Sequence, residues 1–200
     1  MIHNRRSRLP SLVIFLTACL LPAAAILTGC SPDSPAVSTD KPFEKLLYFD
    51  IKGYFRQELK RLATISSVTK TTEVNGVREK RVIAAPDFEK ELTVFINADI
   101  NKPAWSDKYS VDSLFNRNRQ LAGLVYAALD EKLQIRQISV DFIDDQVRKI
   151  TIQSAMHSSI ADSRQQLDYD PEAGYSIESY QRIPFLSQEN AFQVTVRFDQ

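Results

Sequence analysis

The spacing of hydrophobic residues changes its period along this 200-residue chain. Between residues 42 and 63, hydrophobic side chains recur at helical spacing while lysines and arginines take the other side, which predicts an amphipathic helix. Asp40 is the expected N-cap of this helix, and Pro42 lies in its first turn. The side chains expected to face inward are Leu47, Ile51, Tyr54, Phe55, Leu59 and Leu62.

After this helix the pattern becomes typical of strands. Two β-rich runs, 66–74 and 77–85, flank the pair Asn75-Gly76. An Asn-Gly pair between such runs is a strong signal for a β-hairpin, because both turn residues must accept a positive φ. Residues 86–98 predict a second short helix, although residues 93–96 could instead form a strand.

From residue 119 onward the pattern predicts an antiparallel meander. In its last run, Phe192, Val194, Val196 and Phe198 alternate with polar residues, so these four side chains are expected to share one buried face. The order of elements predicts an α+β fold, namely a curved antiparallel β-meander with an N-terminal amphipathic helix and a second short helix packed on it. The expected strands lie near 119–129, 133–143, 147–155, 163–169, 174–183 and 191–199.

The first 29 residues have the layout of a secretory signal, with three arginines before an uncharged hydrophobic stretch. The tetrapeptide Leu27-Thr28-Gly29-Cys30 follows this stretch and resembles the lipobox of bacterial lipoprotein precursors. The resemblance implies cleavage before Cys30, which is then lipidated through its thiol and becomes the mature N-terminus. The alternative is an uncleaved anchor, since Ser11 to Gly29 could just span a bilayer. In both cases the rest of the chain is exported.

The resemblance also implies where the mature protein resides. Cys30 would carry a diacylglyceryl group and usually an N-acyl chain, and two or more chains anchor a protein durably. In some Gram-negative lipoproteins an aspartate after the cysteine retains the protein in the inner membrane. Ser31 occupies that position here, which implies a lipid-anchored protein of the cell envelope at the outer membrane. Cys19 is a poorer candidate because cleavage there would leave a hydrophobic N-terminus.

Composition limits the mature protein to one domain and few chemistries. Residues 30–41 are rich in Pro and Ser and predict a tether, and residues 42–200 can bury the core of a single domain. Removing the signal also removes three arginines from a chain of zero net charge, so the mature protein is slightly acidic and no nucleic-acid partner is expected. No cysteine follows Cys30, so neither a disulfide within the domain nor a thiolate zinc site is expected.

Few residues of the mature domain suggest catalysis or metal binding. His157 is its single histidine, and no nucleophile-elbow pattern accompanies it, so we expect a surface histidine rather than a catalytic base. Asp168, Asp170 and Glu172 form an alternating acidic set that favours turn residues, with a weak calcium site as the alternative. The sequence therefore names no catalytic residue, no metal ligand and no cofactor.

The segment 99–118 predicts a loop-rich connection in which Trp105 and Tyr109 lie near Lys102 and Lys108. Aromatic rings beside polar groups can bind sugars or protein partners. The alternative, which we favour, is a loop that its aromatic side chains hold against the core.

The remaining resemblances add little about activity. The run from Glu91 to Trp105 is similar to uncharacterised bacterial envelope lipoproteins, and the order of elements loosely resembles the half-barrel folds of periplasmic lipoprotein carriers. We therefore expect a membrane-anchored envelope lipoprotein that binds a protein partner or an amphiphilic ligand through its sheet concavity or the 99–118 loop. The alternative is a hydrolase acting on cell-wall or glycan material.

Overall fold

The computed structural model describes residues 46–183 and 188–199, which belong to one of the two units into which the chain divides, Phe43–Gln200. In this part, nine strands form a single sheet, accompanied by two α-helices and one short 3₁₀ helix. No helix of the described residues has the length and apolarity that crossing a membrane requires.

Several predicted features fall elsewhere in the chain. The signal peptide (1–29), the tether (30–41) and the lipidation site Cys30 lie outside the described residues, as do Asp40 and Pro42. The structure therefore concerns only the predicted domain.

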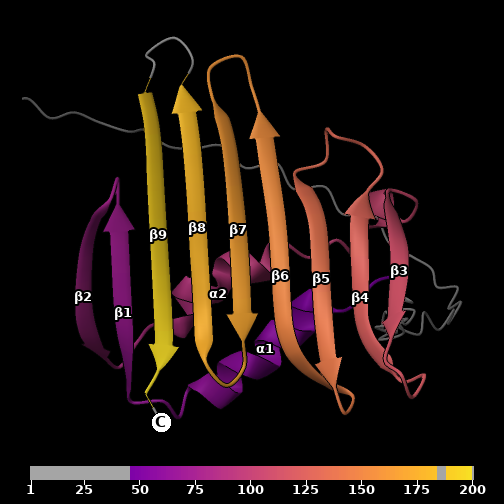
Figure 1. The fold of residues 1–200 in the computed structure, drawn as a ribbon, viewed down its shortest axis with the longest axis horizontal. Helices are drawn as coiled ribbons and strands as arrows, with labels where there is room; N and C mark the ends of the chain where they lie inside the picture. Colours follow the sequence, from indigo (N-terminus) through magenta and orange to yellow (C-terminus); the bar gives the residue numbers. More distant parts are fainter. Residues whose placement is uncertain (1–45, 184–187, 200) are drawn as a thin grey trace, which may run out of the picture. The chain divides into compact units, whose positions relative to one another are not determined.

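The sheet has the strand order β2-β1-β9-β8-β7-β6-β5-β4-β3, and every neighbouring pair is antiparallel (Figure 1). Strands β3 to β9 follow chain order as a meander, and the hairpin of β1 and β2 joins the sheet beside β9. An α+β fold with an antiparallel meander is thus confirmed. The strands are β1 (Ser67–Val74), β2 (Val77–Ala84), β3 (Tyr109–Phe115), β4 (Leu121–Ala128), β5 (Ile135–Ile143), β6 (Gln146–His157), β7 (Asp162–Asp170), β8 (Gly174–Ile183) and β9 (Gln188–Phe198).

The first hairpin has the predicted turn. Asn75 and Gly76 both take positive φ angles, 49° and 85°, which the turn of a two-residue hairpin requires. Asp144 and Asp145 form the corresponding turn between β5 and β6, with φ angles of 50° and 59°. Asn and Asp tolerate this backbone region better than most residues with a side chain.

Strand β3 was not predicted, because the segment 99–118 was expected to be loop-rich. A 3₁₀ turn (η1, Pro103–Trp105) is followed by β3, which pairs with β4 and forms one edge of the sheet. Tyr109 is its single buried residue. An edge strand buries little of its side-chain surface, and in β3 the alternation of hydrophobic and polar residues extends only over 109–112 before the adjacent hydrophobic residues Leu114 and Phe115.

The first helix, α1 (Ile51–Leu62), begins nine residues later than predicted. Its N-cap is Asp50, whose carboxylate accepts a hydrogen bond of 2.7 Å from the backbone N–H of Gly53. The prediction that the helix starts at residue 42 is therefore wrong for the described residues 46–50.

The residues before α1 follow the sheet surface in a non-helical conformation. The side chain of Asn101 accepts a hydrogen bond of 3.0 Å from the Tyr48 N–H and donates one of 3.1 Å to the Phe49 carbonyl. These bonds compete with a helical backbone. As a result Tyr48 is buried, whereas Leu47 is 55% exposed, so the prediction that Leu47 faces inward is wrong.

Both helices lie on the same face of the sheet (Figure 1). Helix α2 (Phe88–Ile96) confirms the second predicted helix and is capped by Asp87. Aromatic side chains pack between the helices and the sheet. The centre of the Phe55 ring in α1 lies 5.0 Å from that of Phe95 in α2 and 4.9 Å from that of Tyr169 in β7. The largest fully buried side chains are Ile51, Phe55, Leu62, Val68, Leu92, Phe95, Ile100, Ile138, Val140, Ile150, Ile152 and Tyr169.

Strands β6 to β9 extend past the helices, which leaves part of the inner face open (Figure 1). The register places Phe192, Val194, Val196 and Phe198 on one face, as predicted. Val194 and Val196 are buried, but Phe192 is 41% exposed. The predicted burial of Phe192 is therefore wrong, because the sheet is longer than the layer that covers it.

Candidate functional site

The face of the sheet opposite α1 and α2, here called the outer face, is polar across six strands. Side chains alternate along a strand, so Gln193 and Thr195 point to the outer face while the buried Val194 and Val196 point to the helices. The cross-strand register continues this division through the neighbouring strands.

One line of side chains crosses the outer face from β1 to β5. Each member pairs with the next in the cross-strand register. The line is about 24 Å long, because it crosses five strand spacings of roughly 4.8 Å. We call it the Gln/Glu row, and its members are Glu73, Gln193, Glu178, Gln166, Gln153 and Gln137.

An open groove of about 660 Å³ follows five members of this row, all except Gln137. Beyond the row, Arg164 and Tyr180 line it, with the Arg164 guanidinium carbon 4.9 Å from the centre of the Tyr180 ring. This volume lies within the range of ligand-binding sites. The remaining lining residues are Gly76, Arg136, Ser154, Ala155, Gln165, Ser179, Ala191 and Phe192.

The charges that line the groove are balanced and partly satisfied. Glu73 forms an ion pair of 2.8 Å with Arg78, and Glu178 accepts a hydrogen bond of 2.7 Å from the Gln193 amide. Each glutamine amide has two N–H donors and one acceptor oxygen. A single internal bond therefore leaves Gln193 with further capacity to bind a ligand.

A second depression of about 370 Å³ adjoins the groove on the same face, over β1, β2 and β9. It shares Glu73 and Gln193 with the groove, and the hydroxyls of several threonines line it. Lys80 and Arg197 also line it, and within the described part of the chain neither forms an ion pair. Positive side chains of the outer face thus line this depression as well as the groove, where Arg136 and Arg164 lie.

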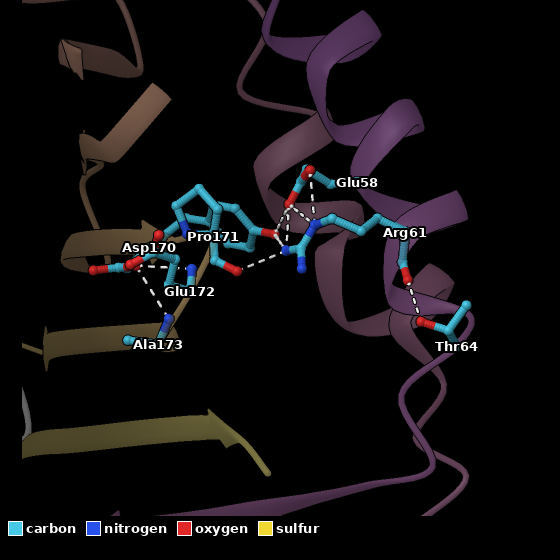
Figure 2. A network of polar contacts seen from close by, with 8 residues as sticks. Glu58, Arg61, Thr64, Asp170, Pro171, Glu172 and Ala173 are labelled. Atoms are coloured by element: carbon cyan, nitrogen blue, oxygen red, sulfur yellow. Dashed lines mark hydrogen bonds and ion pairs between the residues drawn. The ribbon is translucent and has the colours of Figure 1, made fainter. Parts of the chain in front are cut away.

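The most buried charged group lies on the other side of the sheet. Glu58 of α1 receives three hydrogen bonds from the Arg61 guanidinium, the closest at 2.6 Å (Figure 2). It also receives one from the Tyr169 hydroxyl. Arg61 also donates to the Pro171 carbonyl at 2.7 Å, in the turn between β7 and β8. Burial raises the pKa of Tyr169, and the hydrogen bond to Glu58 raises it further, so the hydroxyl remains a donor.

A similar contact between a glutamate and a tyrosine holds α2 on the sheet. The Tyr175 hydroxyl donates to the Glu91 carboxylate, which also pairs with Lys70 of β1 at 2.9 Å. Tyr175 lies directly opposite Tyr169 in the sheet. Among the described residues no buried side-chain nitrogen or oxygen lacks a hydrogen-bond partner. These two Glu–Tyr contacts therefore hold the helices on the sheet and leave no buried polar group free for a substrate.

His157 lies at the exposed end of β6, as expected of a surface histidine. Its Nδ1 is 3.0 Å from a carboxylate oxygen of Asp162. A hydrogen bond from Arg182, and a second from His157, lower the pKa of Asp162. Among the described residues, the His157 ring has a hydrogen-bond contact with Asp162 and none with a serine hydroxyl, so the geometry is that of a polar contact at a strand end.

The acidic set of Asp168, Asp170 and Glu172 does not converge on one point. Asp168 contacts Lys149 at 2.9 Å, whereas Asp170 pairs with Arg148 and accepts hydrogen bonds from the backbone of the turn that follows. Burial alone would raise the pKa of Asp168, but hydrogen bonds from its polar neighbours lower it. Across residues 46–183 and 188–199, no three His, Cys, Asp or Glu side chains are placed to hold a metal ion.

The aromatic residues of the segment 99–118 hold it against the core. The Tyr48 hydroxyl donates to the Trp105 carbonyl at 2.8 Å, and the Lys102 amine lies 3.8 Å from the centre of the Trp105 ring. Tyr109 is buried, and burial raises its pKa to about 12. This segment therefore resembles the packed loop that we favoured.

The Gln/Glu row was missed by the sequence analysis. Each strand shows polar residues at alternate positions, but only the cross-strand register tells which of them stand side by side. The sequence signal that could have suggested the row is the repeated placement of Gln or Glu in strands β5 to β9.

Comparison with known proteins adds no relative. No protein-family model, no curated protein and no solved structure matches this chain. The fold, the outer face and the N-terminal motif therefore carry the argument about function.

Proposed function

We propose that this chain is a lipoprotein of the bacterial cell envelope, anchored through lipidated Cys30, whose domain binds another envelope component. The groove along the Gln/Glu row is the observation that carries the binding role. Amide, carboxylate and guanidinium groups line the groove together with apolar surface from residues such as Ala155, Tyr180 and Ala191. Such a lining suits a partner that offers both hydrogen-bonding groups and apolar surface.

Binding accounts for the groove better than hydrolysis does. Glycoside hydrolysis uses two carboxyl groups, one protonated as the acid and the other free as a base or nucleophile. In the groove, Glu73 is engaged by Arg78 and Glu178 by Gln193. Such contacts suit carboxylates that hold neighbouring side chains in place.

The anchor is tested by substituting each cysteine in the full-length protein. Cys30→Ala is expected to abolish labelling by a radioactive or clickable fatty acid, because the thiol that carries the lipid is gone. The protein should then leave the membrane fraction unless the uncleaved signal retains it. Cys19→Ala is the matched control and should label normally. Labelling that survives Cys30→Ala would refute the anchor.

The binding face is tested by site-specific photo-crosslinking in living cells. A photoreactive residue at position 166, in the groove, is expected to yield an adduct several-fold stronger than one at position 57. Gln57 is the matched control, because it is an exposed glutamine on α1, on the other side of the sheet. The adduct at position 166 should weaken when Gln153→Ala is added. Equal adducts at both positions, or none, would contradict the proposed role of the outer face.

A further inference from the structure

We propose that the groove binds an uncharged glycan chain lying along the Gln/Glu row. This inference rests on the proposed function and names the class of its ligand. Sugar rings present neighbouring hydroxyl groups, each of which donates and accepts a hydrogen bond. Planar amide, carboxylate and guanidinium groups can bond two such hydroxyls at once, and the groove presents all three kinds.

The internal bonds of the row leave these groups available in a fixed orientation. Gln166 donates to Asp168 at 2.8 Å, and Gln193 donates to Glu178 at 2.7 Å. Each bond uses one amide N–H, so the second N–H and the carbonyl oxygen can meet a ligand. Side chains that are already held lose less conformational entropy when the ligand binds.

An aromatic ring adds a surface for the apolar side of a sugar. Tyr180 lies in the groove beside Arg164, whose guanidinium stacks on the ring at 4.9 Å. The Arg164 contact orients the ring from one face. Sugar C–H groups pack against such rings while the hydroxyls reach the neighbouring polar side chains.

The charge and length of the groove distinguish a glycan from other polymers. Two carboxylates, Glu73 and Glu178, balance two guanidinium groups, Arg136 and Arg164, so a polyanion or a polycation gains little. The groove combines the Tyr180 ring and alanine side chains with amide, carboxylate and guanidinium groups, which suits the C–H faces and the hydroxyl groups of sugars. The five members of the row that line the groove span four strand spacings, about 19 Å, which suits a chain of several sugars better than a single one.

The test uses the purified full-length lipoprotein in a detergent without a sugar headgroup. Chitohexaose, cellohexaose and maltohexaose are titrated separately and followed by calorimetry. At least one of them is expected to bind saturably. The double variant Gln153→Ala/Gln166→Ala should weaken that binding about tenfold, which corresponds to the loss of one to three hydrogen bonds. Gln57→Ala should leave it unchanged.

A second variant tests whether misfolding could explain the loss of binding. Tyr180→Leu keeps an apolar side chain but removes the ring, and it should also weaken binding while the melting temperature of both variants stays close to that of the parent protein. Binding by none of the three oligosaccharides, or equal binding by parent and variants, would overturn the glycan assignment. If photo-crosslinking at position 166 then still captured a protein, the proposed function would stand and only the ligand class would be wrong.

Discussion

Replacing Phe55 by alanine is expected to lower the free energy of unfolding by about 3–5 kcal/mol. The side chain is fully buried. The centre of its ring lies 5.0 Å from the ring centre of Phe95, 4.9 Å from that of Tyr169 and 5.3 Å from that of Tyr54. Alanine would leave a cavity where α1, α2 and the sheet meet. Chemical denaturation of the full-length protein, followed by circular dichroism, measures the loss.

The matched control is the same substitution at an exposed position. Phe115, at the end of the edge strand β3, is 63% exposed. Phe115→Ala should change the free energy of unfolding by no more than about 0.5 kcal/mol, as is usual for surface sites. Similar losses at the two positions would show that the core does not centre on Phe55.

Glu58→Ala is expected to destabilise the protein by about 3 kcal/mol, near the lower end for removal of one partner from a buried ion pair. The Glu58 side chain is 12% exposed, and its loss leaves the buried Tyr169 hydroxyl without its acceptor. The Arg61 side chain is 45% exposed, so in the variant water hydrates part of the guanidinium that has lost its carboxylate partner. The melting temperature should fall by roughly 6–12 °C.

An exposed pair with similar geometry provides the control for this prediction. Arg81 contacts Glu79 through two nitrogens, and both side chains are more than half exposed. Glu79→Ala should cost about 0–1 kcal/mol. Glu58→Gln keeps an acceptor for Tyr169, so its loss of stability should lie between those of Glu58→Ala and Glu79→Ala. A loss at Glu58 no larger than that at Glu79 would mean that the cluster in Figure 2 contributes little to stability.

The parts of the fold that depend on neighbours along the chain were predictable. The turn at Asn75-Gly76 depends on two residues that tolerate positive φ, and α2 is marked by its own spacing and its cap. Strands β4 to β9 were visible because inner strands bury one face and alternate with a period of two.

The errors arose where distant residues decide the conformation. Helix α1 begins at its N-cap Asp50, but the residues before it are held out of the helix by Asn101, which lies 53 residues away from Tyr48 along the chain. No local pattern could reveal that hydrogen bond. Likewise, Phe192 has the alternation of a core residue, but whether it is buried depends on how far the helices reach along the sheet.

The same difference between local and distant signals applies to the candidate site. The motif ending at Cys30 is contiguous in sequence, so it was found, and it remains a prediction because it lies outside the described residues. The Gln/Glu row takes its members from six strands, and each glutamine taken alone is an ordinary surface residue. Only the register between strands turns them into a groove.

The pairing of β1 with β9 also dictates when this protein can fold. Thr69 and Asp199 are hydrogen-bonded although they lie 130 residues apart in the chain. Contacts of such separation slow folding, because a long loop must close before the contact forms. The first hairpin can therefore join the sheet only after β9 has been synthesised. A chain that stalls before residue 188 during synthesis would expose the unpaired edge of β1 to aggregation or proteolysis.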